Sequence, residues 1–172
     1  MFRKRVFALV LAAMLALPAE PQIETGEKLL LLAEKLSLTP TAIFYLASLD
    51  TGRKPDEYAR EVFLSLVKNA RGVSGSIAKE GGEMKILLTS IPTKEGEKNA
   101  RSVLRTFLEN DNTVTHILKT EAPEGSPEAI RKRLAGEIIS EEKTIEGLLI
   151  RLEGIEIFIG GNDGGTAYLC SR

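Results

Sequence analysis

The sequence contains one cysteine and one histidine in 172 residues, and both scarcities exclude whole classes of protein. The single cysteine, Cys170, cannot form a disulfide within the chain, so the fold does not depend on a disulfide framework. A metal site requires at least three ligands close together, and no such cluster surrounds the single histidine, His116. We therefore expect no internal disulfide, no metal and no cofactor.

Long apolar runs are also scarce, and the one that exists lies at the amino terminus. A basic segment at 3–5 precedes an unbroken apolar stretch at 6–17, and Pro18 and Ala19 follow. This order is typical of a cleaved secretory signal peptide. The apolar stretch of 12 residues is too short to span a membrane, since a spanning helix needs about 20 residues. The sequence thus predicts signal peptide 1–19 and an exported protein without a membrane span after leader removal.

An excess of positive charge is also missing. Without the leader, the number of basic residues falls from 23 to 20 against 24 acidic residues, so the net charge of residues 20–172 is −4. Tight, general binding to nucleic acid requires concentrated positive charge, so we expect no nucleic-acid partner. No cysteine lies at the predicted cleavage site, which argues against a lipoprotein anchor. The remaining 153 residues are enough for one domain with a hydrophobic core.

Helical and strand-like segments alternate along residues 20–172. Apolar residues at three- and four-residue spacing indicate helices, and short β-branched or aromatic runs between turn residues indicate strands. The segment Thr41–Leu49 fits a buried helix or a strand, and its length and aromatic content favour a strand. We predict helices at Glu24–Leu36, Pro55–Asn69 and Thr93–Glu109 and from Ser126 onward, and strands at Thr41–Leu49, Val73–Lys79, Glu83–Ile91, Thr113–Glu121, Thr144–Leu152, Ile155–Gly160 and Thr166–Cys170. This order predicts a single α+β domain with helices packed on one face of a largely antiparallel sheet.

The helix predicted from Ser126 carries the one basic run of this domain. Ser126 is expected to cap the helix, because a proline and an acidic residue follow it. The inward stripe is predicted to be Ile130, Leu134 and Ile138. The basic run Arg131, Lys132 and Arg133 falls between these positions. Nearby glutamates favour an ordinary solvated face. If the protein binds a polyanion, such as a wall polymer, these three residues are the predicted binding site.

A glycine cluster lies near the carboxyl terminus, within the segment IEIFIGGNDGGTAYLC at 155–170. A phosphate-binding P-loop ends in Gly-Lys-Ser/Thr and opens a helix, but here no lysine follows and 166–170 is strand-like. A calcium-binding glycine-aspartate repeat requires several stacked copies, and the chain has one. The residues at 162–164, Asn-Asp-Gly, lie between two β-rich runs and favour the turn of a hairpin.

Two patterns are compatible with catalysis. Ser76 and Lys79 match the Ser-x-x-Lys spacing of penicillin-binding enzymes, but they lie in a predicted strand, where residues three apart point to opposite faces. The companion motifs of those enzymes are missing. The candidate catalytic residues are His116 and Cys170, although each also fits an ordinary packed residue. In an oxidising compartment, Cys170 could also form a disulfide with another chain.

The order of these segments resembles the YwmB-like secreted proteins of spore-forming, Gram-positive bacteria. The resemblance follows a leader and three segments: TAIFYLASLDTGRKPDEYAREVFLSLV, VTHILKTEAPEGSPEAIRKRLAGEII and IEIFIGGNDGGTAYL. It implies a fold like that of the TATA-box-binding protein. It implies no established activity and supplies no site residues. It does not imply DNA binding, because an exported acidic chain does not meet a promoter.

Three functional hypotheses follow from these observations. The first is an exported, non-catalytic α+β domain that binds an envelope protein or wall polymer through the sheet face that its helices leave free. The alternative is a small extracytoplasmic hydrolase using His116 with an acid and Cys170. Nucleic-acid binding by a saddle-like sheet is the third, and it would show a steep salt dependence.

Overall fold

The computed structural model describes residues 21–50, 57–108, 113–160 and 165–171, which form four helices and eight strands. The predicted signal peptide and the predicted turn at 162–164 lie outside these residues. The helices are α2 (Pro21–Lys35), α3 (Glu57–Asn69), α4 (Lys94–Leu108) and α5 (Ser126–Arg133). The strands are β1 (Thr39–Asp50), β2 (Val73–Glu80), β3 (Glu83–Ser90), β4 (Val114–Glu121), β5 (Ser140–Lys143), β6 (Gly147–Leu152), β7 (Ile155–Gly160) and β8 (Thr166–Ser171).

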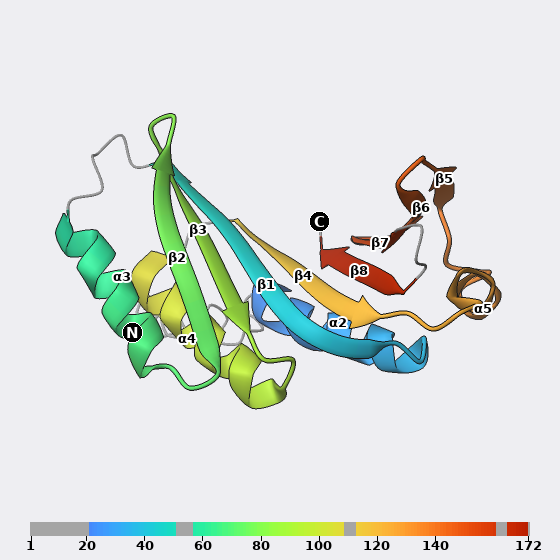
Figure 1. The fold of residues 1–172 in the computed structure, drawn as a ribbon, viewed down its shortest axis with the longest axis horizontal. Helices are drawn as coiled ribbons and strands as arrows, with labels where there is room; N and C mark the ends of the chain where they lie inside the picture. The colour runs from blue at the N-terminus through green and yellow to red at the C-terminus, as the bar shows by residue number, and fades with distance from the viewer. Residues whose placement is uncertain (1–20, 51–56, 109–112, 161–164, 172) are drawn as a thin grey trace, which may run out of the picture.

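All eight strands belong to one sheet with the order β2-β3-β1-β4-β8-β7-β6-β5. Every neighbouring pair is antiparallel. Helices α2, α3 and α4 pack against the same side of the sheet, and the sheet twists so that β5 and β6 run in a different direction from β2 and β3 (Figure 1). The predicted α+β fold, with helices on one face of an antiparallel sheet, is confirmed.

Alternating side chains divide the sheet into a helix-covered face and a helix-free face. In β1, Ile43, Tyr45 and Ala47 are buried toward the helices, whereas Leu46 between them is 40% exposed. The buried apolar side chains of the helices and of the sheet belong to one cluster. Burying a large aliphatic or aromatic side chain stabilises a fold by about 1.5–3 kcal/mol, so this cluster is the main source of stability. We call the two surfaces of the sheet the covered face and the open face.

Two predicted hairpins are present. β2 and β3 are joined by Gly81 and Gly82, whose φ angles of 58° and 91° match the two positive values that a type I′ turn requires. β7 and β8 pair antiparallel, and the pair formed by Gly160 and Thr166 lies nearest the glycine cluster. This pairing confirms the predicted hairpin.

The segment after β4 differs from its prediction. The helix from Ser126 ends at Arg133, so Ile138 lies beyond it, and the chain turns through hydrogen bonds from the amides of Glu137 and Ile138 to the Leu134 carbonyl. The predicted strand from Thr144 begins instead at Gly147. The unpredicted strand β5 has the sequence SEEK and lacks apolar alternation, so no hydrophobic pattern could reveal it.

The predicted serine cap of α5 is also wrong. Gly125 occupies the N-cap position with a φ of 79°, and no side chain caps the helix. The Ser126 hydroxyl donates instead to the Pro123 carbonyl. Glycine adopts a left-handed backbone conformation without strain, which explains why Gly125 and not Ser126 occupies the N-cap position.

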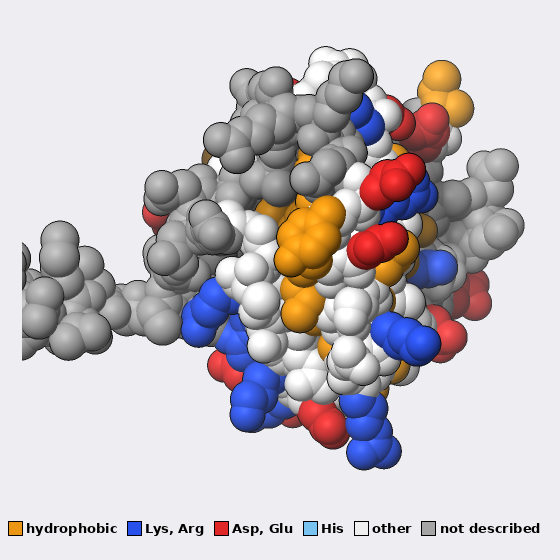
Figure 2. Space-filling model, turned by 90° about the vertical axis from the view of Figure 1, so that its left-hand side faces the viewer, with side chains coloured by type: hydrophobic (Ala, Val, Ile, Leu, Met, Phe, Trp, Pro, Cys, Tyr) orange, Lys and Arg blue, Asp and Glu red, His pale blue; other side chains and the backbone are white. Residues whose placement is uncertain are grey.

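The surface at the α3 end carries mixed charge. Acidic and basic side chains are interspersed there around a small hydrophobic group (Figure 2). Tyr58 and Leu64 of α3 are 72% and 43% exposed.

In the part of the chain that the structure describes, no helix is long and apolar enough to cross a membrane.

Candidate binding site

His116, the first candidate catalytic residue, lies inside the covered face. It is 2% exposed, and its ring meets Tyr45 edge-on with 4.9 Å between the ring centroids. Burial lowers the pKa of His116 to about 4, and the charge of nearby Arg101 acts in the same direction. His116 is therefore a neutral packed side chain at neutral pH, beneath the helices.

A buried acid lies in the same polar cluster. Glu97 of α4 is fully buried, and its carboxylate lies 4.0 Å from the Arg101 guanidinium. Burial raises the pKa of Glu97, although Arg101 opposes the rise. Burial also raises the pKa of Tyr45, and the Glu97 charge adds to that effect. Gly26 of α2 packs directly on Glu97, because a β-carbon there would overlap the carboxyl group. The cluster is thus closed by the backbone of α2.

The structure does not bring His116 and Cys170 together. Cys170 pairs with Ile117, the residue after His116, and therefore points to the open face. The adjacent Ser171 lies on the covered face, where its hydroxyl accepts a hydrogen bond of 3.0 Å from the His116 backbone amide. Burial, and then the charge of Glu156, raise the pKa of the Cys170 thiol, which disfavours the reactive thiolate at neutral pH.

Ser76 and Lys79 do not converge either. Both lie in β2, and their separation of three residues places them on opposite faces of the strand. The part of the chain that the structure describes contains no group of three or more His, Cys, Asp or Glu side chains arranged to hold a metal.

The basic run of α5 is engaged in contacts within the protein. The Arg131 guanidinium donates to both oxygens of Glu141, at 3.0 and 3.1 Å. Arg133 donates to the Lys35 carbonyl at 3.2 Å and to the Ser37 hydroxyl at 2.8 Å, which ties α5 to the end of α2. Lys132 is exposed. Two of the three predicted binding residues, Arg131 and Arg133, thus make contacts within the protein.

The open face carries a row of apolar side chains across its central strands. Leu46 of β1 and its partner Leu87 of β3 are each 40% exposed. The row continues through half-buried neighbours that share the same face by register: Phe44, Ile117, Tyr168, Phe158 and Leu149. No helix among the described residues packs on this face. Apolar side chains that gather on one surface of a protein are a common mark of a binding surface.

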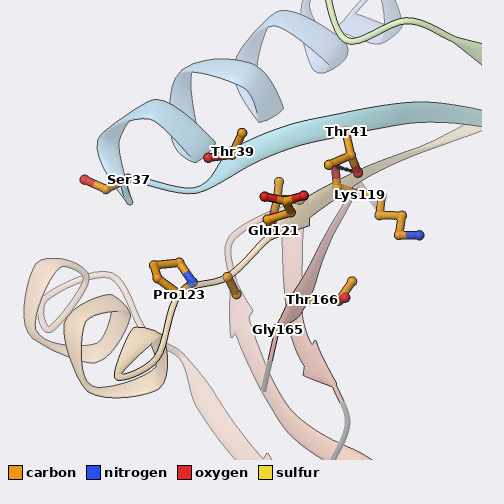
Figure 3. Close-up of a pocket in the computed structure, with 10 residues that line it drawn as sticks. Ser37, Thr39, Thr41, Lys119, Glu121, Pro123, Gly165 and Thr166 are labelled. Carbon is orange, nitrogen blue, oxygen red and sulfur yellow. Dashed lines mark hydrogen bonds between the residues drawn. The ribbon is translucent and has the colours of Figure 1, made fainter. Parts of the chain in front are cut away.

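A pocket of about 580 Å³ lies at one end of the open face (Figure 3). It opens where β1 begins, β4 ends and β8 begins. Its walls are Ser37, Thr39, Thr41, Lys119, Thr120, Glu121, Ala122, Pro123, Gly165 and Thr166. Its volume falls within the range of about 300–1,000 Å³ typical of small-molecule sites.

An irregularity of β1 shapes the mouth of this pocket. Thr39 and Pro40 pair with Glu121 and Thr120, but the next pair is Ala42 with Lys119, so Thr41 is an extra residue in the strand. The Thr41 hydroxyl donates to the Lys119 carbonyl at 3.1 Å and closes the gap. Pairing of β1 with β3 starts only after this point, so the start of β1 is a local edge that tolerates Pro40. Bulges of this kind often lie next to functional sites.

The other wall of the pocket begins at Ser37, which has a φ of 56°. Ser37 follows α2 in a Schellman arrangement: its amide donates to the Glu34 carbonyl, and the Leu38 amide donates to the Ala33 carbonyl. Glycine is the usual residue at this position, because a side chain there costs about 1 kcal/mol or more. Sequence reasoning could not find this pocket, because its lining residues come from three separate segments and form no motif.

The polar groups of the pocket differ in how freely they can bind a ligand. Thr120 is buried, and its hydroxyl donates to the Ala167 carbonyl at 3.0 Å. The side chains of Thr39, Glu121 and Thr166 have no hydrogen-bond partner within the described ranges. The Lys119 side chain extends away from the Glu121 carboxylate (Figure 3). The pocket can therefore offer one carboxylate and two hydroxyls, with a lysine at the rim.

Comparison of the sequence with protein-family models and with curated proteins finds no match.

Proposed function

We propose that this protein is an exported, non-catalytic domain that binds a component of the bacterial cell envelope through its open face. The observation that carries the proposal is the row of apolar side chains beside a polar pocket on the face without helices. The pairing of an apolar surface with a few polar groups is typical of binding sites. The resemblance to the YwmB-like secreted proteins belongs to the same proposal.

The distribution of ionisable groups supports binding over the alternative, hydrolysis by His116. His116 and Glu97 are buried beneath the helices, whereas the pocket carries Lys119 and Glu121. A general base must reach the proton that it removes from a substrate. His116 faces the interior of the domain, and Cys170 lies on the other side of the sheet.

Export is tested by the intact mass of the native protein, isolated from its host without reducing agent. The proposal predicts a chain that begins at Glu20 with no adduct. A chain that retains residues 1–19 would contradict export. A disulfide-linked adduct would instead identify Cys170 as a partner contact on the open face.

Binding is tested by cosedimentation of the purified protein with isolated peptidoglycan sacculi. Leu46→Glu and Leu87→Glu place a charge on the open face, so each should reduce the bound fraction about tenfold or more. Leu31→Glu is the matched control, because Leu31 is an exposed leucine of α2, at 64% exposure, on the helical side. Equal loss in all three variants, or loss in none of them, would contradict the proposal.

A further inference from the structure

We propose that the pocket at the end of the open face is a subsite for one sugar ring of a neutral wall glycan. This inference rests on the proposed binding function and names its ligand class. Four observations support it: the shared face of the pocket and two aromatic rings, the chemistry of the free polar groups, the local charge, and the constrained backbone of the walls.

The pocket and two aromatic side chains lie on one surface. Along β4, Lys119 and Glu121 alternate with the buried Thr120, and along β8, Thr166 and Tyr168 alternate with the buried Ala167. Both sets therefore face the open side. Register places Glu121 opposite Thr166 and Lys119 opposite Tyr168. Tyr168 is therefore the next residue after Thr166 on the open face of β8, beside the pocket.

Phe158 extends this aromatic surface toward the pocket. It pairs with Tyr168, and the next open-face position of β7 is Gly160, which pairs with Thr166. A β-carbon on Gly160 would lie 2.8 Å from Cε1 of Phe158, so the phenyl ring lies against the Gly160 backbone. The absence of a side chain at Gly160 therefore lets Phe158 lean toward Thr166. Aromatic rings of this kind supply rigid apolar area to a binding site.

The free polar groups match the hydroxyls of a sugar. Each sugar hydroxyl both donates and accepts, and adjacent hydroxyls present a donor pair to a carboxylate. Glu121 can accept such a pair, while the hydroxyls of Thr39 and Thr166 can donate or accept. Thr39 lies directly opposite Glu121 across the strand pair, and Thr166 lies opposite Glu121 on its other side. The three groups thus form one short line across β1, β4 and β8.

Charge favours a neutral glycan over an anionic polymer. Glu121 faces the pocket, and residues 20–172 carry a net charge of −4. Three basic residues of the segments that flank the pocket wall, Lys35, Arg131 and Arg133, are engaged with Glu137, Glu141 and the end of α2. Lys119 alone among the pocket residues is basic, and it points away from Glu121 (Figure 3). Phosphate recognition normally uses several such groups together.

The walls of the pocket hold their shape at an energetic cost. Ser37 keeps its left-handed conformation, and its hydroxyl accepts a hydrogen bond from Arg133 at 2.8 Å. Thr41 sits in the bulge, and its hydroxyl bonds to the neighbouring strand. One left-handed residue and one bulge therefore meet at this pocket, and features of both kinds are frequent next to binding sites.

The probe for this inference is a tetramer of β-1,4-linked N-acetylglucosamine, titrated into the purified protein by calorimetry. Glu121→Ala should raise the dissociation constant about tenfold or more, because it removes charge-assisted hydrogen bonds. Tyr168→Ala should raise it by a similar factor. Glu124→Ala is the matched control, because Glu124 is an exposed glutamate three residues along the chain that does not line the pocket. Unchanged thermal unfolding shows that each variant is folded.

The possible results separate this inference from the proposed function. Selective weakening by Glu121→Ala and Tyr168→Ala supports the sugar subsite. No tetramer binding by the wild type, with sacculus binding still lost in the Leu46 and Leu87 variants, overturns the subsite and leaves the proposed function standing. Equal effects of Glu121→Ala and Glu124→Ala also overturn it. Competition by poly(glycerol phosphate), lost in Lys119→Ala, would overturn the neutral glycan in favour of an anionic polymer.

Discussion

The two faces of the one sheet differ in what their alternate side chains meet. Consecutive residues of β3 illustrate this: Leu88 is fully buried against the helices, and Leu87 is 40% exposed on the open face. Helices cover one set of leucines and leave the other in contact with solvent. The exposed set is therefore not needed to build the core, and its apolar character calls for a different explanation. Binding is the explanation that we propose.

The polar groups of the two faces differ in the same way. On the covered face, Tyr45, Glu97 and His116 lie in a closed cluster where burial shifts the pKa of each. On the open face, Glu121 and Thr166 line a pocket that is open to solvent. Titratable residues in an unusual environment are often taken as a sign of function. Here they form a closed cluster, and the candidate site, which is open to solvent, lies on the other face.

The largest expected contrast is between two adjacent leucines. Leu88→Ala should lower the free energy of unfolding by about 2–5 kcal/mol, because it leaves a cavity in the core. Leu87→Ala should lower it by less than about 1 kcal/mol, since its side chain already meets water. Urea denaturation measures both values. Similar losses in the two variants would show that the open face is part of the core.

The pH dependence of stability tests the burial of His116. Its pKa of about 4 in the folded protein lies below its ordinary value of 6.5. As the pH falls from 6.5 to 4, the unfolded chain binds a proton that the folded protein refuses, so stability falls by about 3 kcal/mol. Glu97, whose pKa is raised, opposes part of this loss because its protonation favours the folded state.

His116→Phe isolates the histidine contribution, since Glu97 is retained. The difference in unfolding free energy between wild type and variant should change by about 3 kcal/mol across this window, with the variant losing less stability at low pH. Parallel pH profiles would mean that His116 is solvated in the folded protein.

The contact between Gly26 and Glu97 has a smaller effect. Gly26→Ala should destabilise the protein by about 1–2 kcal/mol, although alanine is the better helix former, because the new methyl overlaps the Glu97 carboxyl. In a Glu97→Ala background the same change should be neutral or stabilising. Gly136→Ala is the control, as a β-carbon there meets nothing within 4 Å. Additive effects at Gly26 and Glu97 would contradict their direct packing.

The smallest expected effect is at Ser37. Ser37→Gly relieves a left-handed backbone at φ 56°, so the free energy of unfolding should rise by up to about 1 kcal/mol. Ser65→Gly in the exposed middle of α3 should change it by about the same amount in the opposite direction. Thermal unfolding of the pair gives the comparison, and a loss of stability in both would show that the Arg133 hydrogen bond outweighs the strain.

Much of the fold could be predicted from local sequence signals. The apolar spacing of Ala100, Val103 and Leu104 identified α4, and the glycines between β2 and β3 identified a hairpin. These signals are strong because each comes from neighbouring residues. β5 was missed because its sequence is acidic and exposed, and its strand conformation depends on pairing with β6. The cap of α5 was misassigned because serine and glycine are adjacent there and both are common at helix starts.

The candidate site could not be predicted in the same way. Its residues come from the end of α2, the start of β1, the end of β4 and the start of β8, and only the sheet order brings them together. Threonine, serine and a single glutamate at such distances form no recognisable motif. By contrast, the sequence suggested His116 as a site residue because it is the single histidine, and Arg131 because it lies in a basic run. In the structure, both side chains make contacts within the protein.

The most direct test of the central claim is hydroxyl-radical footprinting of the protein, free and bound to peptidoglycan sacculi, with residue-level mass spectrometry. The account predicts protection of the open-face residues Leu46, Leu87, Phe158 and Tyr168. It predicts unchanged labelling of Leu31 and Tyr58, which are 64% and 72% exposed on the helices. Protection of the helical residues, with the open face still fully labelled in the bound state, would contradict it.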